Sequence, residues 1–131
     1  MRKAYIAGPM RGYDLFNFPA FDAAKLKLLD EEEYHVVSPA DIDRMFEDWP
    51  KGEMDHEGHY PTQYPPEDFV PTIEDFKRFI RRDLNFLLEL SPENGDAIYL
   101  LKNWEQSKGA RVELALAEFL GLKVLYEDDL S

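Results

Sequence analysis

Two short segments of the chain carry residue types that bind anions. The first, Gly8-Pro9-Met10-Arg11-Gly12, places two glycines and an arginine directly after a short apolar run. Glycine lets a ligand approach the backbone closely, and the forked guanidinium of arginine suits a phosphate. A tight turn with a solvated arginine would explain the same residues, because the loop lacks both a P-loop motif and the spacing of a dinucleotide fingerprint.

The second segment, Ser107-Lys108-Gly109-Ala110, is predicted to open a helix, where free backbone N–H groups and the helix dipole favour an anion. Ser107 is also a good N-cap, which alone would account for it. Glu113 lies about one and a half turns into this helix, among apolar residues. Its carboxylate either lies on the exposed face or points at the ligand site, and geometry alone favours exposure.

Three further polar groups have plainer explanations. Asp83 stands beside two arginines on another predicted helix, where a surface ion pair is the default. Asp96 precedes a strand and could form a turn with residues 94–95. His56 and His59 are spaced so that they could share a metal, but a third ligand is not evident, and we expect no metal site.

Strands and helices alternate in the elements that must position these groups. The apolar patterns predict strands over 3–7, 35–37, 97–101 and 123–126, and helices over 18–32, 40–46, 72–90 and 108–120. Such alternation predicts one α/β domain over residues 1–131, with a flavodoxin- or Rossmann-like parallel sheet of about four to five strands flanked by helices. Ligands of these folds bind beyond the carboxyl ends of the strands, where both anion-binding segments fall.

Residue types also predict how the helices begin, end and face the core. We expect Asn17 and Thr72 to be N-caps and Gly121 to end the last long helix. The first helix should turn one apolar face inward, made of Phe21, Ala24, Leu28 and Leu29.

Residues 49–71 interrupt this alternation. They are rich in Pro, Tyr, Asp and Glu, and they form a longer connection than α/β units commonly have, so we predict a lid-like insertion. Its aromatic side chains could stack on a base, fold onto the protein's own surface or pack on a partner subunit; they are Trp49, Tyr60, Tyr64 and Phe69.

Composition excludes several classes of protein. The 131 residues suit one soluble domain, and no apolar run approaches the roughly 20 residues of a membrane span. The apolar stretch near the N-terminus is too short for a signal peptide, and with no cysteine present we expect a cytoplasmic protein. A net charge of −12 argues against binding of long nucleic acid, although it leaves room for a small phosphorylated ligand.

Three separated segments, residues 5–12, 82–85 and 104–117, together resemble the nucleoside 2-deoxyribosyltransferase-like superfamily and, within it, the DUF4406 group. In that superfamily a glutamate on the last long helix attacks C1′ of the sugar and forms a covalent glycosyl-enzyme; by position this is Glu113. A tyrosine on the first strand, here Tyr5, holds the glutamate in place. An aspartate on the preceding helix, here Asp83, assists protonation of the leaving base. The resemblance therefore implies these three catalytic residues.

The residue at position 107 separates branches of the superfamily. Deoxyribosyltransferases that use unphosphorylated nucleosides carry an acid there, whereas the similar 2′-deoxynucleoside 5′-monophosphate N-glycosidases carry a serine that binds the 5′-phosphate. The chain departs from these hydrolases at Arg111, where they have a glycine, and in the insertion at 49–71. The resemblance implies that the substrate and its phosphate are bound by Gly8, Met10, Arg11, Gly12, Ser107 and Gly109.

We therefore expect an N-glycosidase that hydrolyses a 2′-deoxynucleoside 5′-monophosphate and needs no cofactor. A deoxyribosyltransferase would use the same intermediate, with a second base in place of water. Two non-catalytic alternatives are a module that binds a nucleotide derivative and an interaction protein whose acidic insertion contacts a partner. The resemblance also implies a homodimer or larger homo-oligomer.

Overall fold

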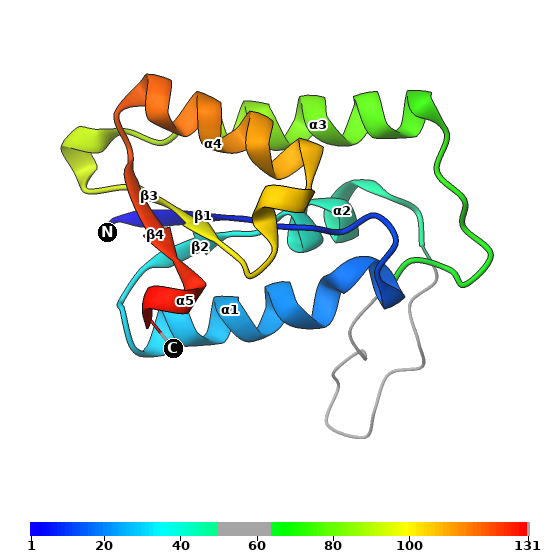
Figure 1. The fold of residues 1–131 in the computed structure, drawn as a ribbon, viewed down its shortest axis with the longest axis horizontal. Helices are drawn as coiled ribbons and strands as arrows, with labels where there is room; N and C mark the ends of the chain where they lie inside the picture. Colours follow the sequence, from blue (N-terminus) through cyan, green and yellow to red (C-terminus); the bar gives the residue numbers. More distant parts are fainter. Residues whose placement is uncertain (50–63, 131) are drawn as a thin grey trace.

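The structure is a computed structural model that describes residues 1–49 and 64–130. Within these residues four strands form one all-parallel sheet in the order β2-β1-β3-β4 (Figure 1). The strands are β1 (Lys3–Ala7), β2 (His35–Val37), β3 (Ala97–Leu100) and β4 (Lys123–Tyr126). The predicted parallel α/β fold is thus confirmed. His56, His59, Tyr60 and most of the 49–71 insertion lie outside the described residues.

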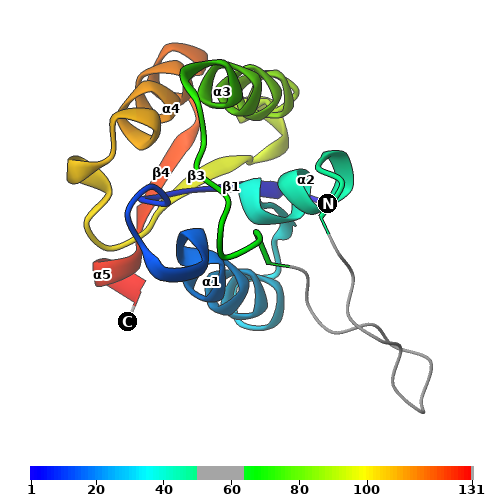
Figure 2. The ribbon, with the colours of Figure 1, turned by 90° about the vertical axis from the view of Figure 1, so that its right-hand side faces the viewer.

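Helices cover both faces of the sheet. Helix α1 (Phe18–Asp30) packs against one face, while α3 (Ile73–Leu88) and α4 (Lys108–Leu120) lie side by side on the other (Figure 2). Helix α2 (Pro39–Phe46) contacts both α1 and α3, and the short α5 (Glu127–Leu130) follows β4. A parallel sheet covered on both faces needs apolar residues throughout its central strands. All four residues of β3 are buried, as are the last four of β1.

The alternation of side chains along β1 assigns its residues to opposite layers. Ala4 and Ile6 belong to the core beneath α1, whereas Tyr5 and Ala7 belong to the core that α3 and α4 cover. Tyr5 pairs in register with Val37 of β2 and with Ile98 of β3. The tyrosine is therefore fixed in the middle of the sheet, pointing toward α4.

In this strand order, the connections that leave β1 and β3 run toward opposite edges of the sheet. From β1 the chain passes through α1 to β2 on one side, whereas from β3 it passes through α4 to β4 on the other. The segments that follow β1 and β3 therefore separate at the carboxyl end of the sheet. Open α/β sheets bind ligands in the crevice that such a switch point leaves.

The predicted ends of the long helices are largely confirmed. Thr72 forms a reciprocal capping box with Asp75, with N···O distances of 3.1 and 2.8 Å. Ser107 Oγ accepts the Ala110 N–H at 3.1 Å at the start of α4. Gly121 ends α4 in the left-handed conformation, with φ of 79°.

Two predictions for α1 are wrong. Asn17 precedes the helix but does not cap it with its side chain; the residue is left-handed, and its Nδ2 donates to the Pro9 carbonyl at 2.8 Å. Leu29, predicted to face inward, is 43% exposed, because only Phe21, Ala24 and Leu28 of the predicted set lie on the sheet-facing side. The structure also contains short 3₁₀ turns over 14–17, 92–94 and 104–106 that the apolar pattern did not predict.

The described ends of the 49–71 segment pack on the protein's own core. The Trp49 ring lies 5.8 Å from that of Phe18 and 6.0 Å from that of Phe69. Phe69 also meets the ring of Phe16 at 5.7 Å, and Tyr64 meets Phe18 at 6.4 Å. Trp49, Tyr64 and Phe69 thus pack on the protein's own side chains, which is one of the three alternatives that the sequence left open. None of the described helices is long and apolar enough to cross a membrane.

Candidate active site

A cavity of about 640 Å³ opens at the switch point of the sheet. Its walls are the loop after β1, the first part of α3, the start of α4 and one residue of α2. Both anion-binding segments reach this cavity, as do the two predicted catalytic carboxylates, those of Asp83 and Glu113. Residues that are more than 100 positions apart in the chain thus meet at one site.

Glu113 is buried on the face of α4 that packs on the sheet. It shares this face with Ala110 and Ala117, and its own exposure is 4%. The hydroxyl of Tyr5, a residue with 0% exposure, donates a hydrogen bond to Glu113 Oε2. The expectation of exposure from geometry alone was wrong, because the small alanines on either side leave room for the carboxylate against the sheet. Tyr5 lies behind the glutamate and holds one of its oxygens.

Asp83 is the second buried carboxylate of the cavity, with 8% exposure. Among the described residues, its Oδ1 has no hydrogen-bond partner. The surface ion pair that would have explained Asp83 is not formed as expected, since Arg82 instead turns to Asp43 and Glu47. A buried, unpaired carboxylate oxygen costs free energy unless it is protonated or meets a ligand.

Burial and mutual repulsion raise the pKa values of these acids. Burial raises the pKa of Asp83 well above its ordinary value, and the charges of Glu113 and Asp43 add to this rise, while Arg82 opposes it. Burial likewise raises the pKa of Glu113 to about 8, against the lowering effect of the Tyr5 hydrogen bond. Of Glu113 and Asp83, only Glu113 accepts a hydrogen bond that favours its ionised form among the described residues, so Asp83 is the better holder of a proton.

The start of α4 offers the cavity a set of hydrogen-bond donors. Ser107 accepts the Ala110 N–H, which leaves its own hydroxyl proton available for a ligand. A Cβ added at Gly109 would meet only Ser107 Oγ, at 3.9 Å, so the glycine leaves open space beside the first turn. Lys108 also lines the cavity. The arrangement suits an anion such as a phosphate.

The loop after β1 contributes differently from what its glycines predicted. A Cβ added at Gly8 would lie 2.7 Å from Leu101 Cβ, so close packing within the protein already requires this glycine. Gly12 has φ of 83° and serves the turn; it is not among the described residues that line the cavity. Met10 and Arg11 do line it, and the Arg11 guanidinium rests 4.6 Å from the centre of the Phe76 ring.

The sequence did not point to the apolar wall of the cavity. Phe76, Phe79 and Ile80, which the helical pattern marked only as apolar, face the cavity from α3. Phe16 joins them from a turn in which Leu15, Phe16 and Asn17 have φ of 53°, 50° and 62°. Left-handed backbone at non-glycine residues costs about 1 kcal/mol each. Nothing in the residue types of this turn signals its shape.

Asp43 is a second residue that the sequence did not single out. It lines the cavity from α2 and is 4% exposed. A signal was present: Asp43 follows Ala40 by one turn, so it lies on the apolar stripe of a short helix. Within residues 1–49 and 64–130, no group of three or more acidic or histidine side chains is arranged to hold a metal ion.

One comparison with known proteins gives a match. Residues 68–126 match the model of a family described as "Domain of unknown function (DUF4406)". This region carries α3, β3, α4 and β4, and therefore Asp83, Ser107 and Glu113, whereas Tyr5 and the loop after β1 precede it. No curated protein and no solved structure matches the chain. The wider resemblance to nucleoside 2-deoxyribosyltransferases stays a prediction.

Proposed function

We propose that this protein hydrolyses the N-glycosidic bond of a 2′-deoxynucleoside 5′-monophosphate and releases the free base and deoxyribose 5-phosphate. One observation carries the proposal: Glu113, held by Tyr5, and Asp83, whose Oδ1 has no partner among the described residues, face the same cavity beside the start of α4. A pair of carboxylates in different environments is what glycosidic chemistry needs, since one serves as nucleophile and the other as acid.

The first half of the reaction transfers the sugar to the protein. A carboxylate oxygen of Glu113 forms a bond to C1′ while the bond from C1′ to the base nitrogen breaks. The electron pair of that bond stays with the base, and the proton of Asp83 neutralises it. The Tyr5 hydroxyl fixes the glutamate and favours its anion through the hydrogen bond to Oε2.

Water completes the reaction. Asp83, now ionised, takes a proton from a water molecule whose oxygen attacks C1′, and the bond from C1′ to Glu113 breaks. Glu113 returns to its carboxylate and Asp83 to its acid, so one water is consumed for each base released.

The remaining walls match the other parts of such a substrate. The hydroxyl of Ser107, the first-turn backbone and Arg11 supply donors for the 5′-phosphate. The rings of Phe76 and Phe79 offer an apolar surface to a planar base. Arg11, now resting over Phe76, would leave the ring to meet the phosphate.

The test is release of free base from a panel of deoxynucleoside 5′-monophosphates, followed by chromatography. The wild type is compared with Glu113→Gln and with Glu118→Gln, which alters an exposed glutamate of the same helix. Release by the wild type and by Glu118→Gln, but not by Glu113→Gln, supports the proposal.

Two other outcomes would replace it. Release that requires an added second base, with the new nucleotide as product, would identify a transferase. Tight binding of the nucleotides by wild type and Glu113→Gln alike, without any release, would identify a binding module and refute the hydrolase.

A further inference from the structure

Three carboxylates, not two, face the cavity. Asp43 reaches it from α2 and is as deeply buried as Glu113, each being 4% exposed. The proposed reaction uses Asp83 and Glu113 and assigns no role to Asp43. A third acid in one apolar cavity raises the cost of ionising the other two, so its presence calls for a physical account.

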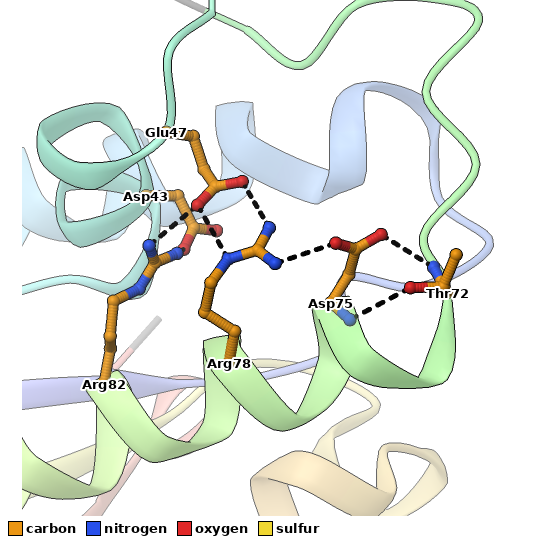
Figure 3. A network of polar contacts seen from close by, with 6 residues as sticks. All are labelled: Asp43, Glu47, Thr72, Asp75, Arg78 and Arg82. Carbon is orange, nitrogen blue, oxygen red and sulfur yellow. Dashed lines mark hydrogen bonds and ion pairs between the residues drawn. The ribbon is translucent and has the colours of Figure 1, made fainter.

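Asp43 is held by a network of ion pairs between α2 and α3 (Figure 3). Arg82 donates to Asp43 Oδ1 at 3.1 Å and to Glu47 Oε2 at 2.7 Å. Arg78, one turn earlier on α3, donates to both oxygens of the same Glu47 and, at 2.8 Å, to Asp75. Glu47 thus receives both guanidinium groups, and Asp43 receives one bond from one of them.

The charges of this network do not cancel. It joins three carboxylates, those of Asp43, Glu47 and Asp75, with the guanidinium groups of Arg78 and Arg82. Of these three acids, only Asp43 is among the described residues that line the cavity. The acid of the network that lies at the cavity with Asp83 is therefore Asp43, which receives a single guanidinium bond, from Arg82.

We propose that Asp43 is a positioning residue whose partly neutralised charge keeps a proton on Asp83, so that Asp83 enters the reaction as an acid. The catalytic meaning of this inference rests on the proposed function, whereas the protonation of Asp83 does not. Asp43 acts through its field on Asp83 and needs no contact with the substrate.

The hydrogen bonds favour Asp83, over Glu113 and Asp43, as the acid that keeps its proton as the pH rises. The groups that face Asp83 are Glu113 from α4, Asp43 from α2, Tyr5 from β1 and its neighbour Arg82 on α3. Glu113 accepts a hydrogen bond from Tyr5, and Asp43 accepts one from Arg82. Both bonds favour the ionised form of their acceptor. Asp83 Oδ1 has no such donor within the described part of the chain, so the ionised form of Asp83 is the least stabilised of the three.

The direction of the pKa shifts agrees with this arrangement. Burial raises the pKa of Asp83, and the charges of Glu113 and Asp43 raise it further. Burial also raises the pKa of Asp43, to about 7, while Arg82 lowers it. Above that pH Asp43 is mainly ionised, and its charge, partly neutralised by Arg82, then acts on Asp83.

The experiment is a carboxyl ¹³C NMR titration of the full chain labelled at aspartate side chains. An Asp83→Asn spectrum identifies the Asp83 signal in the wild type. Asp43→Asn removes the charge but keeps an oxygen acceptor for Arg82, and Asp41→Asn, whose residue pairs with Lys25 and Arg44, is the matched control on the same helix.

Asp83 should titrate well above its ordinary range in the wild type and in Asp41→Asn. In Asp43→Asn its midpoint should fall by about one pH unit or more. Asp43→Ser, which removes the same charge with a smaller side chain, should lower the midpoint in the same way, and it keeps the test informative if Asp43→Asn does not fold. An ordinary midpoint in the wild type, or a midpoint unmoved by both substitutions, would overturn the inference.

A second readout separates this inference from the proposed function. If base release is detected, the alkaline limb of kcat/KM against pH should shift in Asp43→Asn by the same amount as the NMR midpoint. An NMR shift without a shift of the limb would refute the role of Asp83 as the acid. Absence of base release from every nucleotide would refute the proposed function, while the titration would still decide the protonation of Asp83.

Discussion

Replacing Glu113 by glutamine should make the folded protein more stable at neutral pH, although it removes the proposed nucleophile. The wild-type side chain is 4% exposed, and burial raises its pKa from 4.5 to about 8. At pH 7 the folded protein therefore holds a proton on Glu113 that the unfolded chain has released. Holding that proton costs free energy, whereas glutamine is neutral at every pH and keeps an oxygen acceptor for the Tyr5 hydroxyl.

The sign and the size follow from the two pKa values. Because the folded-state pKa is raised, stability is fully present below about pH 4.5 and is lost as the pH rises toward about 8. Between 4.5 and pH 7 the loss accumulates over 7 − 4.5 = 2.5 pH units, which amounts to about 3 kcal/mol. For a domain of this size such a gain corresponds to roughly 10 °C in melting temperature.

Urea unfolding of the wild type and of Glu113→Gln, followed by circular dichroism at pH 4 and at pH 7, measures this difference. The variant should be the more stable protein at pH 7, with the two nearly equal at pH 4. Glu118→Gln, at an exposed position of the same helix, should change little at either pH. Equal stability at pH 7, or the same difference at both pH values, would refute the account of Glu113 as a buried acid.

Other predictions concern the phosphate site, the glycines and the pH dependence. Ser107→Asp should keep the N-cap, so the free energy of unfolding in urea should change by less than about 0.5 kcal/mol. The added negative charge should nevertheless repel the phosphate and raise KM for a 5′-monophosphate at least about tenfold in steady-state kinetics. Ser107→Asn, a neutral N-cap, should raise KM less. Gly109→Ala should stabilise α4 by about 0.5–1 kcal/mol in urea unfolding, because a Cβ there meets only Ser107 Oγ at 3.9 Å. Gly8→Ala should cost about 1–3 kcal/mol in the same assay, since its Cβ would lie 2.7 Å from Leu101 Cβ. Finally, kcat/KM should rise with pH through a midpoint near 8, where Glu113 ionises, and an acid limb near the ordinary value of 4.5 would contradict this.

The fold could be predicted from the sequence because its signals are local. Short apolar runs mark the four strands, and apolar periodicity with capping residues marks the long helices that begin after Thr72 and Ser107. Helix α1 was less predictable at its start. The chain enters it through consecutive left-handed residues, and the Asn17 side chain binds the Pro9 carbonyl, a contact that apolar periodicity does not encode.

The site was only partly predictable, because its geometry depends on contacts between distant segments. Glu113 could have been placed more firmly, since Ala110 and Ala117 flank it on the stripe that faces the sheet. The burial of Asp83 could not, because it depends on Arg82 turning away to Asp43 of α2 and to Glu47 directly after that helix, 39 and 35 positions earlier. The local sequence shows two arginines beside Asp83 and suggests that one of them pairs with it. In the tertiary structure Arg82 pairs with Asp43 and Glu47 instead.

The ion-pair network and the proposed chemistry are connected through Arg82. Had Arg82 paired with Asp83, that carboxylate would have been held as an anion and could not have protonated a leaving base. By pairing with Asp43 and Glu47 instead, Arg82 joins α2 to α3, and Asp83 Oδ1 has no partner in the part of the chain that the structure describes. In the proposed chemistry, the same contact would hold a wall of the cavity in place and let Asp83 keep its proton. Arg82 acts on Asp83 through its charge and not through a hydrogen bond, so burial and the neighbouring acids still raise the pKa of Asp83.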